Sequence, residues 1–206
     1  MDFLDSARYV VAILVIASFP PAWLLWLAIH PFAAFWRRMG PVWTYVLLGL
    51  PVVGYIAGVW ILRRALVGRD LGTNMFTMLL AAIVLVAAAL LKRSVMAQLR
   101  FAALSGIPEL SKEKYPGKLL TGGIYGRIRN PRYIEAQLWT LAYVLFANYL
   151  GAYIVVVLCL PLMFVVVWLE ERELRQRFGA AYEEYCRRVP RFAPKARRRD
   201  DEASKR

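Results

Sequence analysis

The chain is organised around one polar run in its last third, Gly122-Gly123-Ile124-Tyr125-Gly126-Arg127-Ile128-Arg129-Asn130-Pro131-Arg132-Tyr133. A long, mostly apolar stretch over residues 134–169 follows it, and two carboxylates, Glu170 and Glu171, follow that stretch. If the apolar stretch folds as a hairpin, both polar clusters reach the same membrane surface. We therefore take their convergence as the candidate functional site.

Backbone chemistry predicts how the polar run is built. Gly122 and Gly123 allow conformations that other residues avoid. Pro131 fixes its own φ, pushes Asn130 towards an extended shape and suits the first turn of a helix. The run should therefore be an extended segment that leads into a helix N-terminus. The free N–H groups and partial positive charge of that terminus favour a polar or anionic ligand group.

The composition is that of a membrane protein. Hydrophobic residues make up 60% of the 206 residues, and the mean hydropathy is +0.47, whereas soluble domains are about half apolar. The excess lies in long blocks, as it does in membrane spans. The net charge of +13 then fits basic loops that face anionic lipid headgroups. Because no recognised nucleic-acid-binding module presents this charge, we expect no nucleic-acid partner.

Five apolar blocks predict an all-α fold, a polytopic membrane bundle of about five transmembrane helices with a cytosolic C-terminal helix. Pro20 and Pro21 interrupt the first block, so residues 9–36 form either one kinked span or two short re-entrant pieces. The predicted spans cover residues 9–29, 42–62, 75–91, 134–146 and 153–169. A tight turn is predicted over residues 148–151, and a charged helix over residues 170–188.

The length favours one structural domain. Within it we expect N-terminal transmembrane helices over residues 1–104 and a cofactor-binding C-terminal region with the helical hairpin over residues 105–194. A mixed acidic and basic tail over residues 195–206 is predicted to be disordered. Asp2 and Asp5 precede the first apolar block, where a cleaved signal peptide would carry positive charge, so we expect a retained span.

Basic residues predict the orientation. With five spans and the N-terminus outside, the outer side holds Arg8, Arg63, Arg64 and Arg69, and the inner side holds all the other basic residues. The positive-inside rule then places the polar clusters in the cytoplasm. We expect a multi-pass protein of the bacterial inner membrane whose active site faces the cytoplasm. The arginines at positions 63, 64 and 69 are the evidence against this assignment.

Two common kinds of site are not predicted. The single histidine, His30, and the two separated cysteines lack the spacing of a metal or redox motif, so we expect no metal site. Gly122, Gly123 and Gly126 do not match the GxGxxG fingerprint, and no strand pattern surrounds them. Glu170 and Glu171 are either solvated or paired, because carboxylates at the end of a membrane helix need water or a partner. Arg129 across the hairpin favours a paired site for a zwitterionic ligand.

A combination of short segments carries a family resemblance: Gly123-Ile124-Tyr125, Arg129-Asn130-Pro131-Arg132-Tyr133, Glu170-Glu171, Phe178-Gly179, Tyr182, Tyr185 and Val189-Pro190-Arg191-Phe192. Over roughly residues 115–194 this combination resembles the isoprenylcysteine carboxyl methyltransferase and phospholipid methyltransferase superfamily. The resemblance implies an integral-membrane enzyme that uses S-adenosylmethionine without a Rossmann domain.

The resemblance also implies site residues. The cofactor would be enclosed by the segment before Gly-x-Tyr, the Arg-Asn-Pro-x-Tyr segment and the acidic pair, which here are Lys118, Leu119, Leu120, Gly123, Tyr125, Arg129, Asn130, Pro131, Tyr133, Glu170 and Glu171. The catalytic candidates are Arg129 and Glu135. Glu135 either acts as a base, orients an amine or hydroxyl, or is an ordinary carboxylate at the membrane boundary. Methyl transfer itself requires only that donor and acceptor are aligned and water is excluded.

Two departures from the family pattern bear on the chemistry. Asn130 occupies the position of the family's histidine. Asparagine can still form hydrogen bonds, but it lacks the titratable group of histidine. The run Val165-Val166-Val167 stands where prenylcysteine enzymes place an arginine, so a substrate carboxylate would lose solvation without compensation. We therefore expect a lipid-like or hydrophobic acceptor that is neutral or cationic, and poor use of farnesylcysteine analogues. Two alternatives stay open: a steroid-reductase-like membrane reductase that uses NADPH, and a non-enzymatic membrane scaffold.

Overall fold

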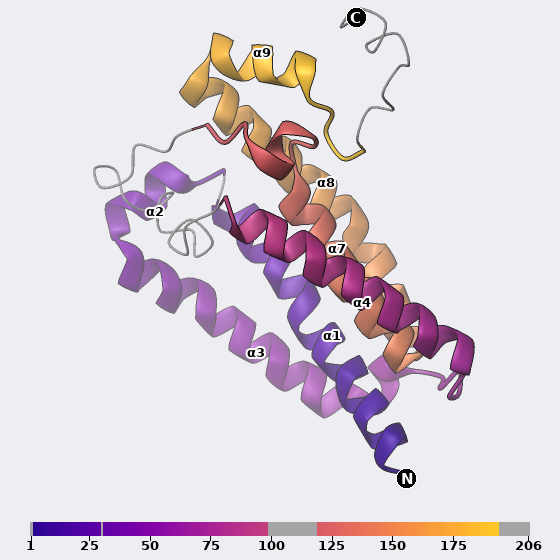
Figure 1. The fold of residues 1–206 in the computed structure, drawn as a ribbon. Helices are drawn as coiled ribbons and strands as arrows, with labels where there is room; N and C mark the ends of the chain where they lie inside the picture. The colour runs from indigo at the N-terminus through magenta and orange to yellow at the C-terminus, as the bar shows by residue number, and fades with distance from the viewer. Residues whose placement is uncertain (1, 30, 99–118, 194–206) are drawn as a thin grey trace, which may run out of the picture.

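The computed structural model describes residues 2–29, 31–98 and 119–193, and over them the chain forms a bundle of α-helices (Figure 1). These are α1 (Phe3–Ile29), α2 (Ala33–Met39), α3 (Pro41–Val67), α4 (Met75–Met96), α7 (Pro131–Ala147), α8 (Leu150–Phe178) and α9 (Ala180–Arg188), with a 3-10 turn, η1 (Gly123–Gly126). Within the described ranges the only β-pairing is an isolated bridge between Asp70 and Tyr149. The all-α prediction is confirmed.

Four of the described helices, α1, α3, α4 and α8, are long and apolar enough to cross a membrane. Helix α7 has 17 residues, which spans about 25 Å at 1.5 Å per residue. It runs beside the longer helices and packs mainly on α4 and α1. Each of the five predicted apolar blocks lies inside one of these five helices, so the predicted membrane bundle is confirmed.

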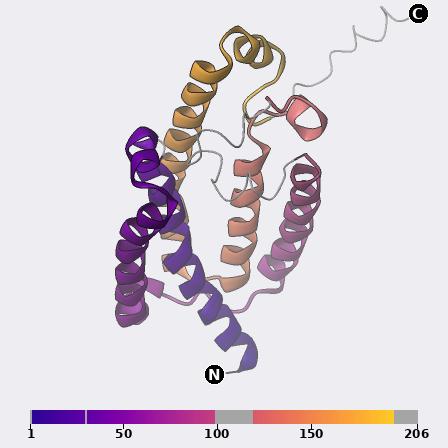
Figure 2. The same cartoon turned by 90° about the vertical axis from the view of Figure 1, so that its left-hand side faces the viewer.

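Helix α1 is the centre of the bundle, and it contacts α3, α7 and α8 (Figure 2). Pro20 and Pro21 lie inside one continuous helix, so the first apolar block forms a single span-length helix rather than two short pieces. Its buried side chains recur at helical spacing, as expected for a face that packs against several neighbours. On this face they are Arg8, Ala12, Val15, Ile16, Phe19 and Trp23, and Pro21 is also buried, on another face.

Polar contacts hold the helices together at the end of the bundle that carries the N-terminus. The side chain of Arg8 is 1% exposed, and its guanidinium contacts Asp5 Oδ1 at 3.1 Å and Asp70 Oδ1 at 2.5 Å. Asn148 ends α7 with φ 53 and donates a hydrogen bond to the carbonyl of Gly72 at 2.9 Å. The predicted tight turn between α7 and α8 is therefore confirmed, and it is attached to the α3–α4 connection.

The opposite end of the bundle carries α9 and the candidate site (Figures 1 and 2). The single charged helix predicted over residues 170–188 is wrong in one respect. Gly179, with φ +51, ends α8, and α9 starts at the next residue. Such a backbone conformation favours glycine, and it turns the chain so that α9 lies across the end of the bundle. The tail over residues 195–206 and most of the loop over residues 105–121 lie outside the described residues, so the division into regions stays a prediction.

Candidate functional site

The polar run leads into a helix N-terminus as predicted, but the prediction that it is extended is wrong. Residues Gly123–Gly126 form the 3-10 turn η1, and the N–H groups of Arg127 and Ile128 both donate to the carbonyl of Ile124. After η1 the chain continues to Asn130, and α7 begins at Pro131, which occupies the first helical turn. Gly123 adopts φ +56, and a Cβ atom there would lie 2.7 Å from the Nε2 atom of Gln98. The glycine thus allows both the left-handed backbone and the close approach of the end of α4. As a result η1 packs against the end of α4.

The last described segment returns to pair with this run. The N–H of Arg129 donates to the carbonyl of Pro190 at 2.9 Å, and the N–H of Asn130 donates to the carbonyl of Arg191 at 3.2 Å. Arg129 also donates from Nη1 to the carbonyl of Cys186 at 3.1 Å. Two segments separated by about 60 residues of sequence therefore form one unit at the end of α8.

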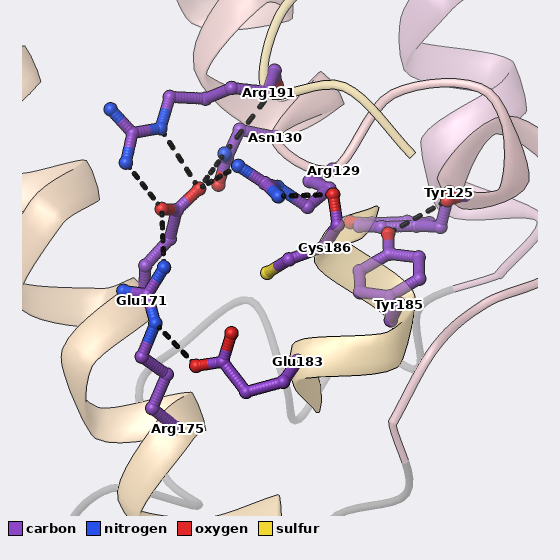
Figure 3. A network of polar contacts seen from close by, with 9 residues as sticks. All are labelled: Tyr125, Arg129, Asn130, Glu171, Arg175, Glu183, Tyr185, Cys186 and Arg191. Carbon is purple, nitrogen blue, oxygen red and sulfur yellow. Dashed lines mark hydrogen bonds and ion pairs between the residues drawn. The ribbon is translucent and has the colours of Figure 1, made fainter. Parts of the chain in front are cut away.

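Glu171 is the centre of the polar network (Figure 3). Its side chain is 0% exposed. Oε1 accepts hydrogen bonds from Asn130 Nδ2 at 2.9 Å and Arg191 Nε at 3.1 Å, and Oε2 accepts one from Arg191 Nη2 at 2.5 Å. Arg129 Nη2 lies 3.4 Å from Oε1. A buried carboxylate requires such pairing, and here its oxygens are held by the protein itself.

The neighbouring carboxylate, Glu170, has a different environment. It is half-buried, and it accepts a short hydrogen bond from the hydroxyl of Tyr133. The ring of Tyr133 is buried and stacks on Trp23 of α1, with centroids 5.9 Å apart and an interplanar angle of 25°. The two adjacent acids are therefore not equivalent: Glu171 faces the interior of the network, whereas Glu170 lies at its edge.

Two tyrosines connect η1 with α9. The hydroxyl of Tyr185 donates to the carbonyl of Tyr125 at 2.7 Å. Burial raises the pKa of Tyr125, Arg132 opposes this shift, and Glu170 and Glu135 add to it. Burial also raises the pKa of Tyr185 to about 12. Both phenols therefore stay protonated at neutral pH, and that of Tyr185 acts as a hydrogen-bond donor.

The electrostatic balance of the network is positive. Arg129, Arg191 and Arg175 lie within 4.0 Å of Glu171, and Glu183 pairs with Arg175 at 2.9 Å. Three guanidinium groups thus face two carboxylates. The hydrogen bond with Glu171 raises the pKa of Arg191, although burial opposes it. The surplus of positive charge immediately around Glu171 favours an anionic group near Arg129.

The structure brings most of the predicted site residues together. Arg129, Asn130, Tyr133, Glu170 and Glu171 form one connected set, and Gly123, Tyr125 and Pro131 lie in the segment that carries it. Leu119 packs against the cluster of Tyr182, Tyr185 and Val189, and Leu120 is half-buried. Glu135 is half-buried on α7 and acts electrostatically on Tyr125. Lys118 lies outside the described residues.

Several residues around the site were not among the predicted site residues. Arg175, Glu183, Tyr185 and Cys186 belong to the network, and two further contacts, those of Arg191 and Trp23, show why. Arg191 belongs to a segment that the family resemblance includes, but the sequence alone does not indicate that its side chain reaches Glu171. Trp23 stands in the first apolar block, and an apolar pattern cannot single out the one tryptophan that stacks on Tyr133. Both contacts depend on tertiary packing between distant segments.

Comparison with known proteins adds one finding. A model of the family described as phospholipid methyltransferase matches residues 76–181, slightly more than half of the chain. The matched region contains α4, η1, α7, α8 and the first residues of α9. Neither the curated proteins nor the solved structures include a match to the chain. The match therefore covers the polar network from η1 to Glu171 but not Trp23 or Arg191.

Proposed function

Because the chain belongs to the phospholipid methyltransferase family, we propose that it moves a methyl group from S-adenosylmethionine to a lipid-like or hydrophobic acceptor at the membrane surface. One observation carries this proposal: the polar run of residues 122–133 and the acidic pair meet at the end of an apolar hairpin. This arrangement places a polar site for a water-soluble donor at the end of apolar, membrane-length helices, where an apolar acceptor is dissolved in the bilayer.

The residues present fit S-adenosylmethionine, which carries a carboxylate, an ammonium group and ribose hydroxyls. The Nε atom of Arg129 is buried and has no hydrogen-bond partner among the described residues. Glu170 is the half-buried acid of the pair, and a carboxylate accepts hydrogen bonds from an ammonium group or from hydroxyls. We therefore assign the ligand carboxylate to Arg129 and the ammonium or ribose to Glu170. When bound, this cofactor supplies an electrophilic methyl group on a sulfonium.

The other candidate residues have supporting roles in this proposal. Glu171 orients Arg129 and Asn130 rather than touching the ligand, because its oxygens are already engaged. Gly123 and Tyr125 shape the backbone beside the site, and Tyr133 positions Glu170 through its hydroxyl. Glu135 orients an amine or hydroxyl of the acceptor.

The acceptor is proposed to be neutral or cationic. Val165 is 45% exposed, whereas Val166 and Val167 are 0% and 1% exposed, so this turn of α8 presents no charge on either face. A substrate carboxylate placed there would be desolvated without a partner. The acceptor enters from the bilayer, and the cofactor enters from the cytoplasm, which is the side that we assign to the site.

Binding measurements on detergent-purified protein test the cofactor assignment. We expect S-adenosylmethionine to bind and NADPH not to bind. The variant Glu170→Gln should weaken the binding about tenfold, as expected for the loss of one charge-assisted hydrogen bond. Glu184→Gln, an exposed acid on α9, is the matched control and should leave the affinity unchanged. Preferential NADPH binding would favour the reductase alternative, and binding of neither cofactor would favour a scaffold.

A further inference from the structure

An apolar cavity lies between α1 and α3. Its volume is about 210 Å³, and Pro21, Leu24 and Leu25 of α1 and Pro51, Val52 and Tyr55 of α3 line it. The α1 residues of this lining are spaced so that they share one face of the helix. Trp23, which stacks on Tyr133, lies on another face. The cavity is therefore separate from the candidate functional site, and it also lies outside the region matched by the family.

The chemistry of the lining admits only hydrocarbon. Among the lining residues named above, Tyr55 alone carries a polar side-chain group, and its hydroxyl already donates to the carbonyl of Ile16 at 2.8 Å. The single donor of that tyrosine is therefore already used, and only its phenol oxygen could still accept a hydrogen bond. Water needs two to four polar partners, and an engineered apolar cavity of about 150 Å³ stays dry and binds benzene. Water is therefore a poor occupant of this cavity.

The cavity opens towards the surroundings of the bundle. On α1, Leu24 is 51% exposed. On α3, the residues on either side of Pro51 and Val52 are also exposed, Leu50 to 66% and Val53 to 64%. Both walls belong to helices that are long and apolar enough to cross a membrane. The medium at this opening is therefore the hydrocarbon of the bilayer.

We propose that the cavity between α1 and α3 is a lipid site that binds one acyl chain of a membrane phospholipid. An unfilled cavity loses the dispersion contacts of its lining, and an acyl chain restores them. A helix of a second protein copy has a diameter of about 10 Å, which is too wide for a space between two helices of one bundle. The flexible chain of a lipid is narrow enough to enter.

Photolabelling tests this proposal directly. The full-length protein is placed in phosphatidylcholine nanodiscs that contain a small fraction of phosphatidylcholine with a diazirine in one acyl chain. After illumination, the labelled residues are mapped by mass spectrometry. We expect label on Leu24 and Leu25 to exceed label on Leu79 and Ile83, which are 58% and 66% exposed on α4, by about fivefold, because a bound chain stays longer than a chain that only touches the surface.

A matched pair of variants separates the cavity from the general membrane surface. Val52→Trp fills the cavity and should reduce the label on Leu24 and Leu25 to the level found on α4. Val53→Trp places the same side chain at the next position, which is exposed, and should leave the label on Leu24 and Leu25 unchanged. If Val52→Trp does not fold, as judged by gel filtration and thermal unfolding, Val52→Phe takes its place.

Three results would overturn the proposal. One is equal label on α1 and α4 in the unmodified protein, and another is an equal effect of the two tryptophan variants. The third is efficient disulfide cross-linking between two copies of the chain that carry Val52→Cys, because this would identify a second copy as the occupant. None of these readouts depends on methyl transfer, so the lipid site and the enzymatic activity are tested separately.

Discussion

Arg191 and Glu171 form a bidentate ion pair, with Nη2 2.5 Å from Oε2 and Nε 3.1 Å from Oε1. The pair connects the last described segment with α8, and the same segment accepts backbone hydrogen bonds from Arg129 and Asn130. Arg191 thus contacts α8 through its guanidinium and the polar run through its backbone carbonyl. Bidentate geometry of this kind is specific to arginine.

Replacement of Arg191 should therefore loosen the whole network. Arg191→Ala leaves the buried carboxylate of Glu171 with fewer partners, and we expect a loss of about 2 kcal/mol in the free energy of unfolding. Arg191→Lys keeps the charge but not the two parallel hydrogen bonds, so we expect an intermediate loss. Thermal unfolding in detergent measures both. Arg188→Ala, on the exposed side of α9, should change the stability little, and an Arg191→Ala protein as stable as this control would contradict the role of the pair.

The two adjacent acids should respond differently to the same substitution. Glu170→Gln removes a charge at the edge of the network, so we expect weaker cofactor binding with little change in stability. Glu171→Gln removes the one carboxylate that faces three arginines, so we expect a loss of stability of about 3 kcal/mol. Calorimetric binding and thermal unfolding of both variants check this difference. If neither variant alters cofactor affinity, the acidic pair is not part of the cofactor site.

The contact between Asp70 and Arg8 predicts a dependence on pH at the other end of the bundle. Burial raises the pKa of Asp70, but hydrogen bonds from the Gly72 N–H and from Arg8 outweigh it, so the pKa is lowered. The contribution of Asp70 to stability is therefore fully present above the unfolded-state pKa of about 3.9. It is lost as the pH falls through the lower folded-state pKa.

Asp70→Asn tests this contribution. Its unfolding temperature should lie below that of the unmodified protein at pH 7, and the difference should shrink as the pH falls below about 4. Because the side chain of Asp70 is 42% exposed, the effect should be modest. A difference that stays constant between pH 7 and pH 3 would show that the charge of Asp70 does not act through Arg8.

Orientation in the membrane is tested with single cysteines at two exposed positions. Arg187 belongs to α9, beside the site. Arg69 belongs to the α3–α4 connection, where its carbonyl accepts a hydrogen bond from the N–H of Leu150 at the start of α8. Cys159 and Cys186 are first replaced by serine. In inverted membrane vesicles, which expose the cytoplasmic side, a membrane-impermeant maleimide should label position 187 and not position 69. The reverse pattern would overturn the cytoplasmic assignment of the site.

The sequence was sufficient to locate the five long helices because each contains a distinct apolar block. It left residues 9–36 open between one span and two pieces, and it did not predict the short helix α2. It was also sufficient for the start of α7 at Pro131, but not for the run before it, where the glycines permit a tight 3-10 turn instead of the predicted extended segment. It could not separate the roles of Glu170 and Glu171, since adjacent helical residues point in directions about 100° apart and the rotation of α8 is set by packing. It also could not find Trp23 or the contact of Arg191, because both depend on segments that are distant in the chain. The break at Gly179 has a local cause, and the predicted continuous helix overlooked it.

Methyl transfer itself tests the central claim most directly. The purified protein, reconstituted in vesicles of extracted membrane lipid, is incubated with S-adenosylmethionine that carries a labelled methyl group, and the products are separated by solvent extraction. We predict label in an organic-soluble product that is neutral or cationic. Arg129→Ala should abolish it and Glu184→Gln should not. Farnesylcysteine analogues should be poor acceptors. Absence of any labelled product, or turnover of a farnesylcysteine analogue that is abolished by prior methylation of its carboxylate, would contradict the account.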